Sequence, residues 1–214
     1  MKMHVLKLAM GVALLGAGLT GCATKPYDYT NFRAHPPRSI LVLPPLNQST
    51  DVGGTYSYLS TVSQPIAEMG YYVFPVAVVD RFFKENGMPT AGEMHQAPLD
   101  KVRDILGADA VLYVTLTQYG TKYRVLSSVT VVVAACKLVD TQTGTVLWEG
   151  TISAQDSSGG SGNLLGDLIA AAITQAINNS IDHGHEVARM ANQQFRVKNY
   201  GLLYGPYSPE YGKK

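Results

Sequence analysis

The fold is decided by one stretch of sequence, Val129-Thr-Val-Val-Val-Ala-Ala-Cys-Lys-Leu-Val139, followed by Asp140-Thr-Gln-Thr-Gly144 and Thr145-Val-Leu-Trp-Glu-Gly150. β-Branched residues dominate its first part, and they are typical of strands that are buried in a sheet. The polar turn joins this part to a second apolar run, which continues to about Ala154. The pattern predicts two neighbouring strands, the first of which extends back to Lys122 with Ser127-Ser128 as a candidate bulge.

Strands and helices alternate in the part of the chain that precedes this stretch. Further strands are expected over 39–44, 71–75 and 110–119, with Gly120-Thr121 as the hairpin link to the strand that begins at Lys122. Helices are expected over 56–69, 76–86 and 99–106, and each is followed by a glycine that can end it. We therefore expect one α/β domain over residues 39–195, with a mixed sheet of about five strands packed by helices.

The strongest helical pattern in the chain covers residues 163–181. This helix is apolar nearly all round and is poor in charge, so we expect it to be buried against the sheet or against a second copy of the chain. Its candidate partner interface contains Ile169, Ala172 and Ala176. A short helix over 185–195 is the last element expected.

The N-terminus indicates the compartment. Lys2 and Lys7 precede an apolar run over 8–19, which is too short to span a bilayer and suits a signal peptide over residues 1–21. The run ends in Leu19-Thr-Gly-Cys22, which resembles a bacterial lipobox whose cysteine thiol receives the lipid. We therefore expect acyl chains such as palmitate on Cys22. Ala23 follows that cysteine, and by resemblance to enterobacterial sorting this favours the outer membrane.

Two tyrosine-rich flanks enclose the expected domain. Residues 22–38 contain the lipidated cysteine and three prolines, and they are interpreted as an extended tether. Residues 196–214 form a Tyr/Gly/Pro-rich C-terminal tail with Tyr200, Tyr204, Tyr207 and Tyr211. Tyrosine is enriched in interfaces, so the tail either folds back on its own domain or docks to a partner.

Composition excludes several classes of protein. The apolar fraction of 46% is enough for a core, and the net charge of +1 argues against nucleic-acid binding. Charged residues make up only 15%, whereas a typical soluble domain has about 25%. Since part of this scarcity lies in the signal peptide and the rest in one helix and two flanks, it indicates contact surface rather than catalysis.

A search for catalytic chemistry finds no active site. His183 and His185 are two residues apart, a spacing that does not place both on one helical face, so a helix cap is favoured over a metal site. Nucleotide-binding and hydrolase motifs are absent from the sequence. Cys136 lies in a predicted buried strand and is interpreted as a core residue, with a catalytic thiol or an intermolecular disulfide as alternatives. We expect no enzyme activity, no cofactor and no metal.

Three stretches carry a family resemblance: Ile40-Leu-Val-Leu-Pro-Pro-Leu-Asn47, Leu106-Gly-Ala-Asp-Ala-Val-Leu-Tyr113 and Lys137-Leu-Val-Asp-Thr-Gln-Thr-Gly-Thr-Val-Leu-Trp-Glu149. They resemble periplasmic α/β modules of TolB N-terminal type, which also occur in CsgG-type lipoproteins and in lipoprotein activators of peptidoglycan synthases. The mature chain as a whole is most similar to a lipoprotein family of unknown function that includes a meningococcal surface-antigen candidate. The resemblance implies fold and compartment, and it implies no catalytic residues.

These observations favour a periplasm-facing outer-membrane lipoprotein, with exposure on the cell surface left open. It would act as a non-enzymatic binding or assembly component, with a CsgG-like lipoprotein or a second copy as its partner. The alternative is an activator of a peptidoglycan synthase, but a tether of sixteen residues reaches only about 50 Å. That reach is short for crossing the peptidoglycan layer, so this function ranks second.

Overall fold

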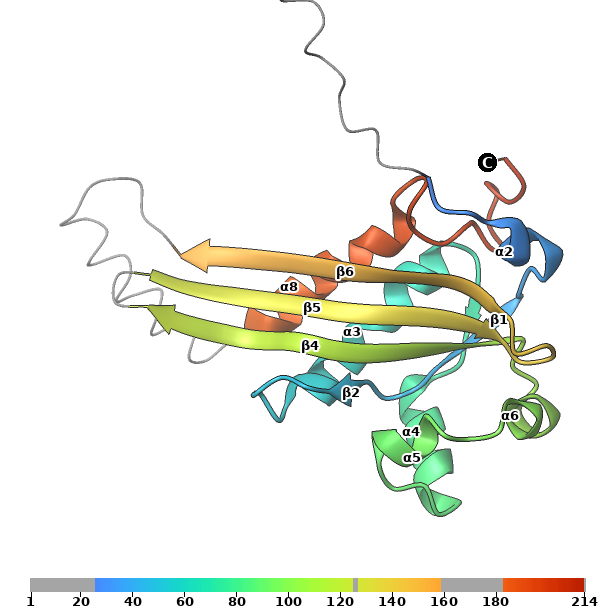
Figure 1. Cartoon of the computed structure of the whole chain (residues 1–214), viewed down its shortest axis with the longest axis horizontal. Coiled ribbons are helices and arrows are strands. Elements are labelled where there is room, and N and C mark those ends of the chain that lie inside the picture. Colours follow the sequence, from blue (N-terminus) through green and yellow to red (C-terminus); the bar gives the residue numbers. More distant parts are fainter. Residues whose placement is uncertain (1–25, 125–126, 159–182, 214) are drawn as a thin grey trace, which may run out of the picture.

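The computed structural model describes residues 26–124, 127–158 and 183–213 of the chain. Its strands form one mixed sheet with helices on both faces (Figure 1). The strands are β1 (Ser39–Val42), β2 (Leu46–Asn47), β3 (Tyr72–Val73), β4 (Ala110–Arg124), β5 (Ser127–Asp140) and β6 (Val146–Ser158). The helices are α2 (Thr30–Ala34), α3 (Gly54–Glu68), α4 (Val76–Glu85), α5 (Ala91–Met94), α6 (Leu99–Leu106), α8 (His183–Asn192) and the 3₁₀ helix η2 (Gln193–Arg196).

The sheet has the order β3-β1-β4-β5-β6, and β2 pairs with β4 beside this path. β1 is parallel to β3 and β4, whereas β4, β5 and β6 are antiparallel. This arrangement confirms the expected α/β class with a mixed sheet. The additional strand is β2, whose two residues are too few to give a pattern in the sequence.

The first hairpin is not where the sequence predicted it. Gly120 and Thr121 do not form a turn, because they pair with Val131 and Thr130 inside the β4–β5 ladder. β4 continues to Arg124, so the expected single strand over 122–139 contains the end of β4 and most of β5. The register shift lies between Leu116 and Gln118 rather than at the candidate bulge. Gly120 has a φ of 106°, and a Cβ there would lie 3.1 Å from the Asp51 carboxylate, so this glycine permits the close approach of a loop.

Alternate residues of the long strands face two different layers. On the inner face, α3 and α8 cover the sheet, and Asn192 Nδ2 of α8 donates to Thr61 Oγ1 of α3 at 2.9 Å. The inner cluster includes Tyr58, Val62, Ile66, Leu112, Leu116, Val132, Leu138, Trp148, Val187 and Phe195. On the outer face, α4, α5 and α6 form a smaller cluster over β1 and the start of β4, with Leu41, Leu43, Val79, Phe83, Met94, Val102 and Val111.

Glycines end the helices as the sequence predicted. Gly70, Gly87 and Gly107 follow α3, α4 and α6 with φ values of 88°, 83° and 72°, which L side chains rarely adopt. The helix expected over 163–181 lies outside the described residues. Within the described ranges, no helix is long and apolar enough to cross a membrane.

The N-terminal flank is not an extended tether where the structure describes it. Tyr29 directly precedes α2 and Phe32 lies within it, and both rings are buried in the inner cluster. The Tyr29 hydroxyl donates to the Gly201 carbonyl at 2.5 Å, and the Tyr27 amide donates to the Asn199 carbonyl at 2.9 Å. The expectation was wrong for this part because two aromatic rings supply enough apolar surface to pack a segment that is otherwise polar. Cys22 and the predicted signal peptide lie outside the described residues.

The C-terminal tail folds back on the domain, which is one of the two alternatives left open by the sequence. The Gly205 amide donates to the Met69 carbonyl at 2.9 Å, and the Tyr207 amide donates to the Gly70 carbonyl at 3.1 Å. Trp148 Nε1 donates to the Tyr200 carbonyl at 2.7 Å. The tail therefore closes one side of the inner cluster.

Candidate interaction surfaces

The predicted interface residues fall into two groups. Ile169, Ala172, Ala176 and Cys22 lie outside the described residues, so nothing brings them together here. Of the four tail tyrosines, Tyr204 is half-buried against the inner cluster. Tyr200, Tyr207 and Tyr211 are 43%, 67% and 48% exposed. The tail backbone thus belongs to the domain, while three of its phenol rings remain accessible.

Side chains from the N-terminal flank and from η2 cover part of the free edge of β6, which ends the sheet. The Glu149 amide donates to the Tyr27 hydroxyl at 3.1 Å, and Asn31 Nδ2 donates to the Val146 carbonyl at 3.3 Å. Gln194 accepts from the Ser153 amide and donates to its carbonyl. These contacts occupy backbone groups that an added strand would use, so this part of the edge is a poor docking site.

A wide concavity with a volume of about 770 Å³ lies on the outer face. It forms because α4, α5 and α6 cover only the β1 side of that face. The floor of this groove is the outer face of β4, β5 and β6, and His95 and Leu99 form one wall. Strand residues that line it include Tyr113, Thr115, Ala135, Lys137, Val146, Glu149 and Thr151. The sequence did not reveal this groove, because its residues come from distant segments and follow no motif.

Polar groups gather at one end of the groove. His95 Nε2 lies 2.9 Å from the Pro44 carbonyl, and its ring meets Tyr113 edge-on at 5.3 Å. Lys137 Nζ lies 5.7 Å from the Tyr113 ring centroid, and Glu149 is the cross-strand neighbour of Lys137. Burial lowers the pKa of His95, the Pro44 carbonyl opposes this, and the Lys137 charge adds to the lowering. The groove therefore offers both charge signs and a mainly neutral imidazole at neutral pH.

Beyond the groove, no described helix covers the outer face of the long strands. Val129, Val131 and Val133 of β5 are partly exposed in a row, with polar residues on the neighbouring strands. Ala135, Lys137, Glu149 and Thr151 on the groove floor are exposed, and so is Ser153 next to it. We call the groove and this row together the open face. An apolar row with polar borders is typical of protein-binding surfaces.

The candidate chemical groups of the sequence do not form an active site in the described residues. Cys136 is buried beside Tyr58, and burial raises the pKa of its thiol to about 12, which fits a core residue and not a reactive thiol. His183 Nδ1 lies 3.8 Å from Asp156 Oδ2 on β6, whereas His185 Nδ1 lies 3.4 Å from the Ser60 hydroxyl on α3. The two imidazoles thus contact different elements. In the described ranges no group of three or more His, Cys, Asp or Glu side chains is arranged to hold a metal ion.

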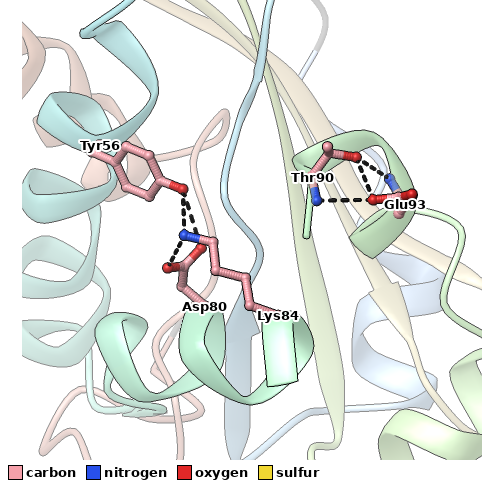
Figure 2. A network of polar contacts seen from close by, with 5 residues as sticks. All are labelled: Tyr56, Asp80, Lys84, Thr90 and Glu93. Atoms are coloured by element: carbon pink, nitrogen blue, oxygen red, sulfur yellow. Dashed lines mark hydrogen bonds and ion pairs between the residues drawn. The ribbon is translucent and has the colours of Figure 1, made fainter. Parts of the chain in front are cut away.

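Another polar network joins two helices (Figure 2). Lys84 Nζ donates to Asp80 at 2.7 Å and to the Tyr56 hydroxyl at 2.9 Å, linking α4 to α3. The hydrogen bond to Asp80 is the main reason why the pKa of Lys84 rises to about 12. Nearby, Thr90 and Glu93 form a capping box at the start of α5. Within each of these two clusters the polar side chains pair with one another, so both clusters have a structural role.

Comparisons with known proteins agree with this architecture. The family model described as "Putative lipoprotein GNA1162-like" matches residues 27–207. The chain belongs to the GNA1162-like lipoprotein family. The match begins at Tyr27 and ends at Tyr207, so it includes most of both packed flanks.

Individual relatives support this membership. The protein named "Putative lipoprotein NMB1124/NMB1162" of Neisseria meningitidis serogroup B is 43% identical over 205 residues, covering 93% of this chain and 95% of its own. The crystal structure of lipoprotein GNA1162 from N. meningitidis has 48% identity and a TM-score of 0.55, covering 66% of this chain and 99% of that one. A PelC dodecamer structure from Paraburkholderia phytofirmans is more distant, with 15% identity, a TM-score of 0.47 and coverage of 79% and 90%. Membership of this family supports a lipoprotein that is anchored to a membrane of the cell envelope.

Proposed function

We propose that the protein is a non-enzymatic binding or assembly component of an envelope or export complex. It is held on the periplasmic face of the outer membrane by lipidated Cys22. Its partner is a CsgG-like lipoprotein or a second copy of this chain. The observation that carries the proposal is the open face: β4, β5 and β6 are long strands covered by helices on one side and accessible on the other.

The residues of the open face suit protein recognition. Lys137 and Glu149 supply opposite charges beside the Tyr113 ring, and the valine row supplies apolar area. Protein interfaces commonly combine an apolar centre, an aromatic anchor and a polar rim. The volume of about 770 Å³ lies within the range of ligand sites, yet its groups do not include a nucleophile paired with a base.

The alternative, activation of a peptidoglycan synthase, now has a stronger geometrical argument against it. Tyr27 and the residues that follow pack on the domain and cannot extend a tether, and only four residues lie between Cys22 and Tyr27 in the sequence. That segment spans at most about 18 Å, which is much less than the roughly 50 Å expected for a fully extended tether. An activator anchored in the outer membrane must reach farther, so this function ranks second.

Site-specific photo-crosslinking in living cells tests the proposal. A photoreactive residue at Thr151, exposed on the open face, is expected to give one discrete adduct with a CsgG-like lipoprotein or with the chain itself. The matched control at Lys101, exposed on α6, is expected to give none. Equal adducts at both positions, or capture of a peptidoglycan synthase at Thr151, would contradict the proposal. Mass spectrometry of the N-terminal peptide, compared with Cys22→Ala, tests the anchor separately.

A further inference from the structure

The short connection between Cys22 and the domain restricts where the domain can lie. Tyr27 is fixed by its hydrogen bond to Asn199, and its hydroxyl accepts from Glu149. Five residue steps separate Cys22 from Tyr27, and they span at most about 18 Å. If Cys22 carries the lipid, as proposed above, the surface around Tyr27 is held within a short distance of the bilayer.

Two adjoining concavities mark the surface from which the chain leaves toward Cys22. One has a volume of about 390 Å³ and is lined by Pro26, Tyr27, Lys198 and Lys213, among others. The second has a volume of about 270 Å³ and includes Tyr211. Both are lined by Arg33 and Leu203, so they form one continuous surface. We call it the anchor-side face, and in Figure 1 it lies where the blue and red segments meet.

The chemistry of the anchor-side face matches a lipid headgroup layer. Arg33, Lys198 and Lys213 are exposed there, and Tyr211 is 48% exposed. Lysine and arginine are attracted to anionic lipids, and tyrosine is enriched at membrane interfaces. Two carboxylates also lie on this face: Asp28 accepts a hydrogen bond from Thr30, and Glu210 pairs with Lys213 at 3.2 Å, so the three cations outnumber the acidic groups by one.

We propose that the anchor-side face lies directly on the headgroups of the membrane that holds the lipid anchor. The inference deepens the proposed function, and it rests on lipidation of Cys22. Arg33 and Lys198 contact lipid phosphates, and the Tyr211 ring lies at the interface. In Figure 1, α4 and α5 lie at the lower edge whereas α2 and the C-terminal segment lie at the upper right, so α4 and α5 point away from the membrane. This orientation keeps the open face accessible from the periplasm.

Depth-dependent quenching tests the orientation. The full lipidated chain, with a fluorophore attached at Tyr211→Cys, is reconstituted into vesicles of phosphatidylethanolamine and phosphatidylglycerol that carry a headgroup quencher. We expect quenching severalfold greater than for the same label at Val78→Cys on α4. Cys136 is buried with a raised pKa, so the unsubstituted protein serves as the labelling control. Equal quenching at both positions overturns the proposal.

Removal of charge tests whether the cations of the anchor-side face bind it to anionic lipid headgroups. Each removed cation is expected to weaken attraction to an anionic surface by about fivefold, so Arg33→Gln with Lys198→Gln and Lys213→Gln lowers the quenching at residue 211. The matched triple Arg81→Gln, Lys101→Gln and Lys122→Gln has the same net charge and is expected to retain it. Equal losses in both triples would overturn the proposal.

Two further results separate the possible failures. Absence of acyl mass on Cys22 contradicts the anchor itself, and with it the proposed function. Normal acylation together with a water-exposed label at residue 211 contradicts only the orientation. Shielding of that label in native membranes but not in pure lipid vesicles means that a protein covers the face, and this also overturns the proposal.

Discussion

The two faces of the β4–β6 sheet are built from the same strands and differ in almost every other respect. Leu112, Leu116 and Leu138 point to the inner face and are fully buried, whereas Ala135 and Lys137 alternate with them on the outer face and are exposed. The difference arises because α3 and α8 cover the inner face and no described helix covers the outer face of β5 and β6. Within the described residues, the inner face of β5 and β6 therefore contributes far more buried apolar surface than their outer face, which is the surface proposed above to bind a partner.

The largest effect is the difference in stability expected between truncations on the two faces of β5. Leu138→Ala leaves a cavity in the inner cluster and is expected to lower the free energy of unfolding by about 2–5 kcal/mol. Val133→Ala, five residues earlier on the outer face, is expected to lower it by less than about 1 kcal/mol. Chemical denaturation measures both variants. Similar losses would show that something covers the outer face as well.

The second effect concerns the edge of the inner face, where the C-terminal tail packs on the domain. Gly70→Ala places a Cβ at a φ of 88° and in collision with the Ser208 amide nitrogen. We expect a loss of about 1–3 kcal/mol from the backbone alone, with an additional loss from displacing the tail. Gly87→Ala is the matched control, since its φ is 83° and nothing lies within 4 Å. If both variants lose the same stability, the tail contributes nothing to the inner face.

A smaller effect is expected where the two flanks meet. Tyr29→Phe removes the hydroxyl that donates to the Gly201 carbonyl, leaving a buried acceptor unpaired. The expected loss is about 1 kcal/mol, seen in the unfolding free energy and in faster proteolysis of the tail. Tyr72→Phe, on an exposed ring, is the control. A neutral Tyr29→Phe would mean that the ring alone holds the flanks together.

The smallest effect is a change of stability at mildly acidic pH, and it arises from His95 in the groove. Because the pKa of His95 is lowered in the folded protein, the unfolded chain binds this proton more readily. The free energy of unfolding should therefore fall as the pH drops below about 6.5. His95→Gln should reduce that fall, whereas His35→Gln serves as the control for removing a histidine. An unchanged pH dependence would show that the groove end is more hydrated than its burial indicates.

The sequence was most informative where a periodic pattern coincided with a conformational requirement. The glycines after α3, α4 and α6 marked helix ends correctly, because only a left-handed residue fits there. The same reasoning failed at Gly120, since a strand glycine can also permit the approach of a loop such as that of Asp51. A glycine shows that the backbone needs freedom, but it does not identify the reason.

The flanks and the groove were harder to predict because their contacts are distant in sequence. The segment with Tyr29 and Phe32 was interpreted as a tether, because nothing near it in the sequence indicates that Tyr29 bonds to Gly201 or that both rings join the inner cluster. The groove joins His95, from the loop after α5, to Tyr113, Lys137 and Glu149 on three strands. Such a surface exists only after the register of the sheet is set, so no local pattern could reveal it.

The hydrogen bond between Tyr29 and Gly201 joins residues 172 positions apart. A chain is synthesised from its N-terminus, so the docking site for Tyr29 does not exist until nearly the whole protein has been made. Contacts of such separation form late, because the loop that they close is long. Tyr29 therefore cannot pack until the C-terminal segment is complete, and the end of synthesis is the event that buries its ring.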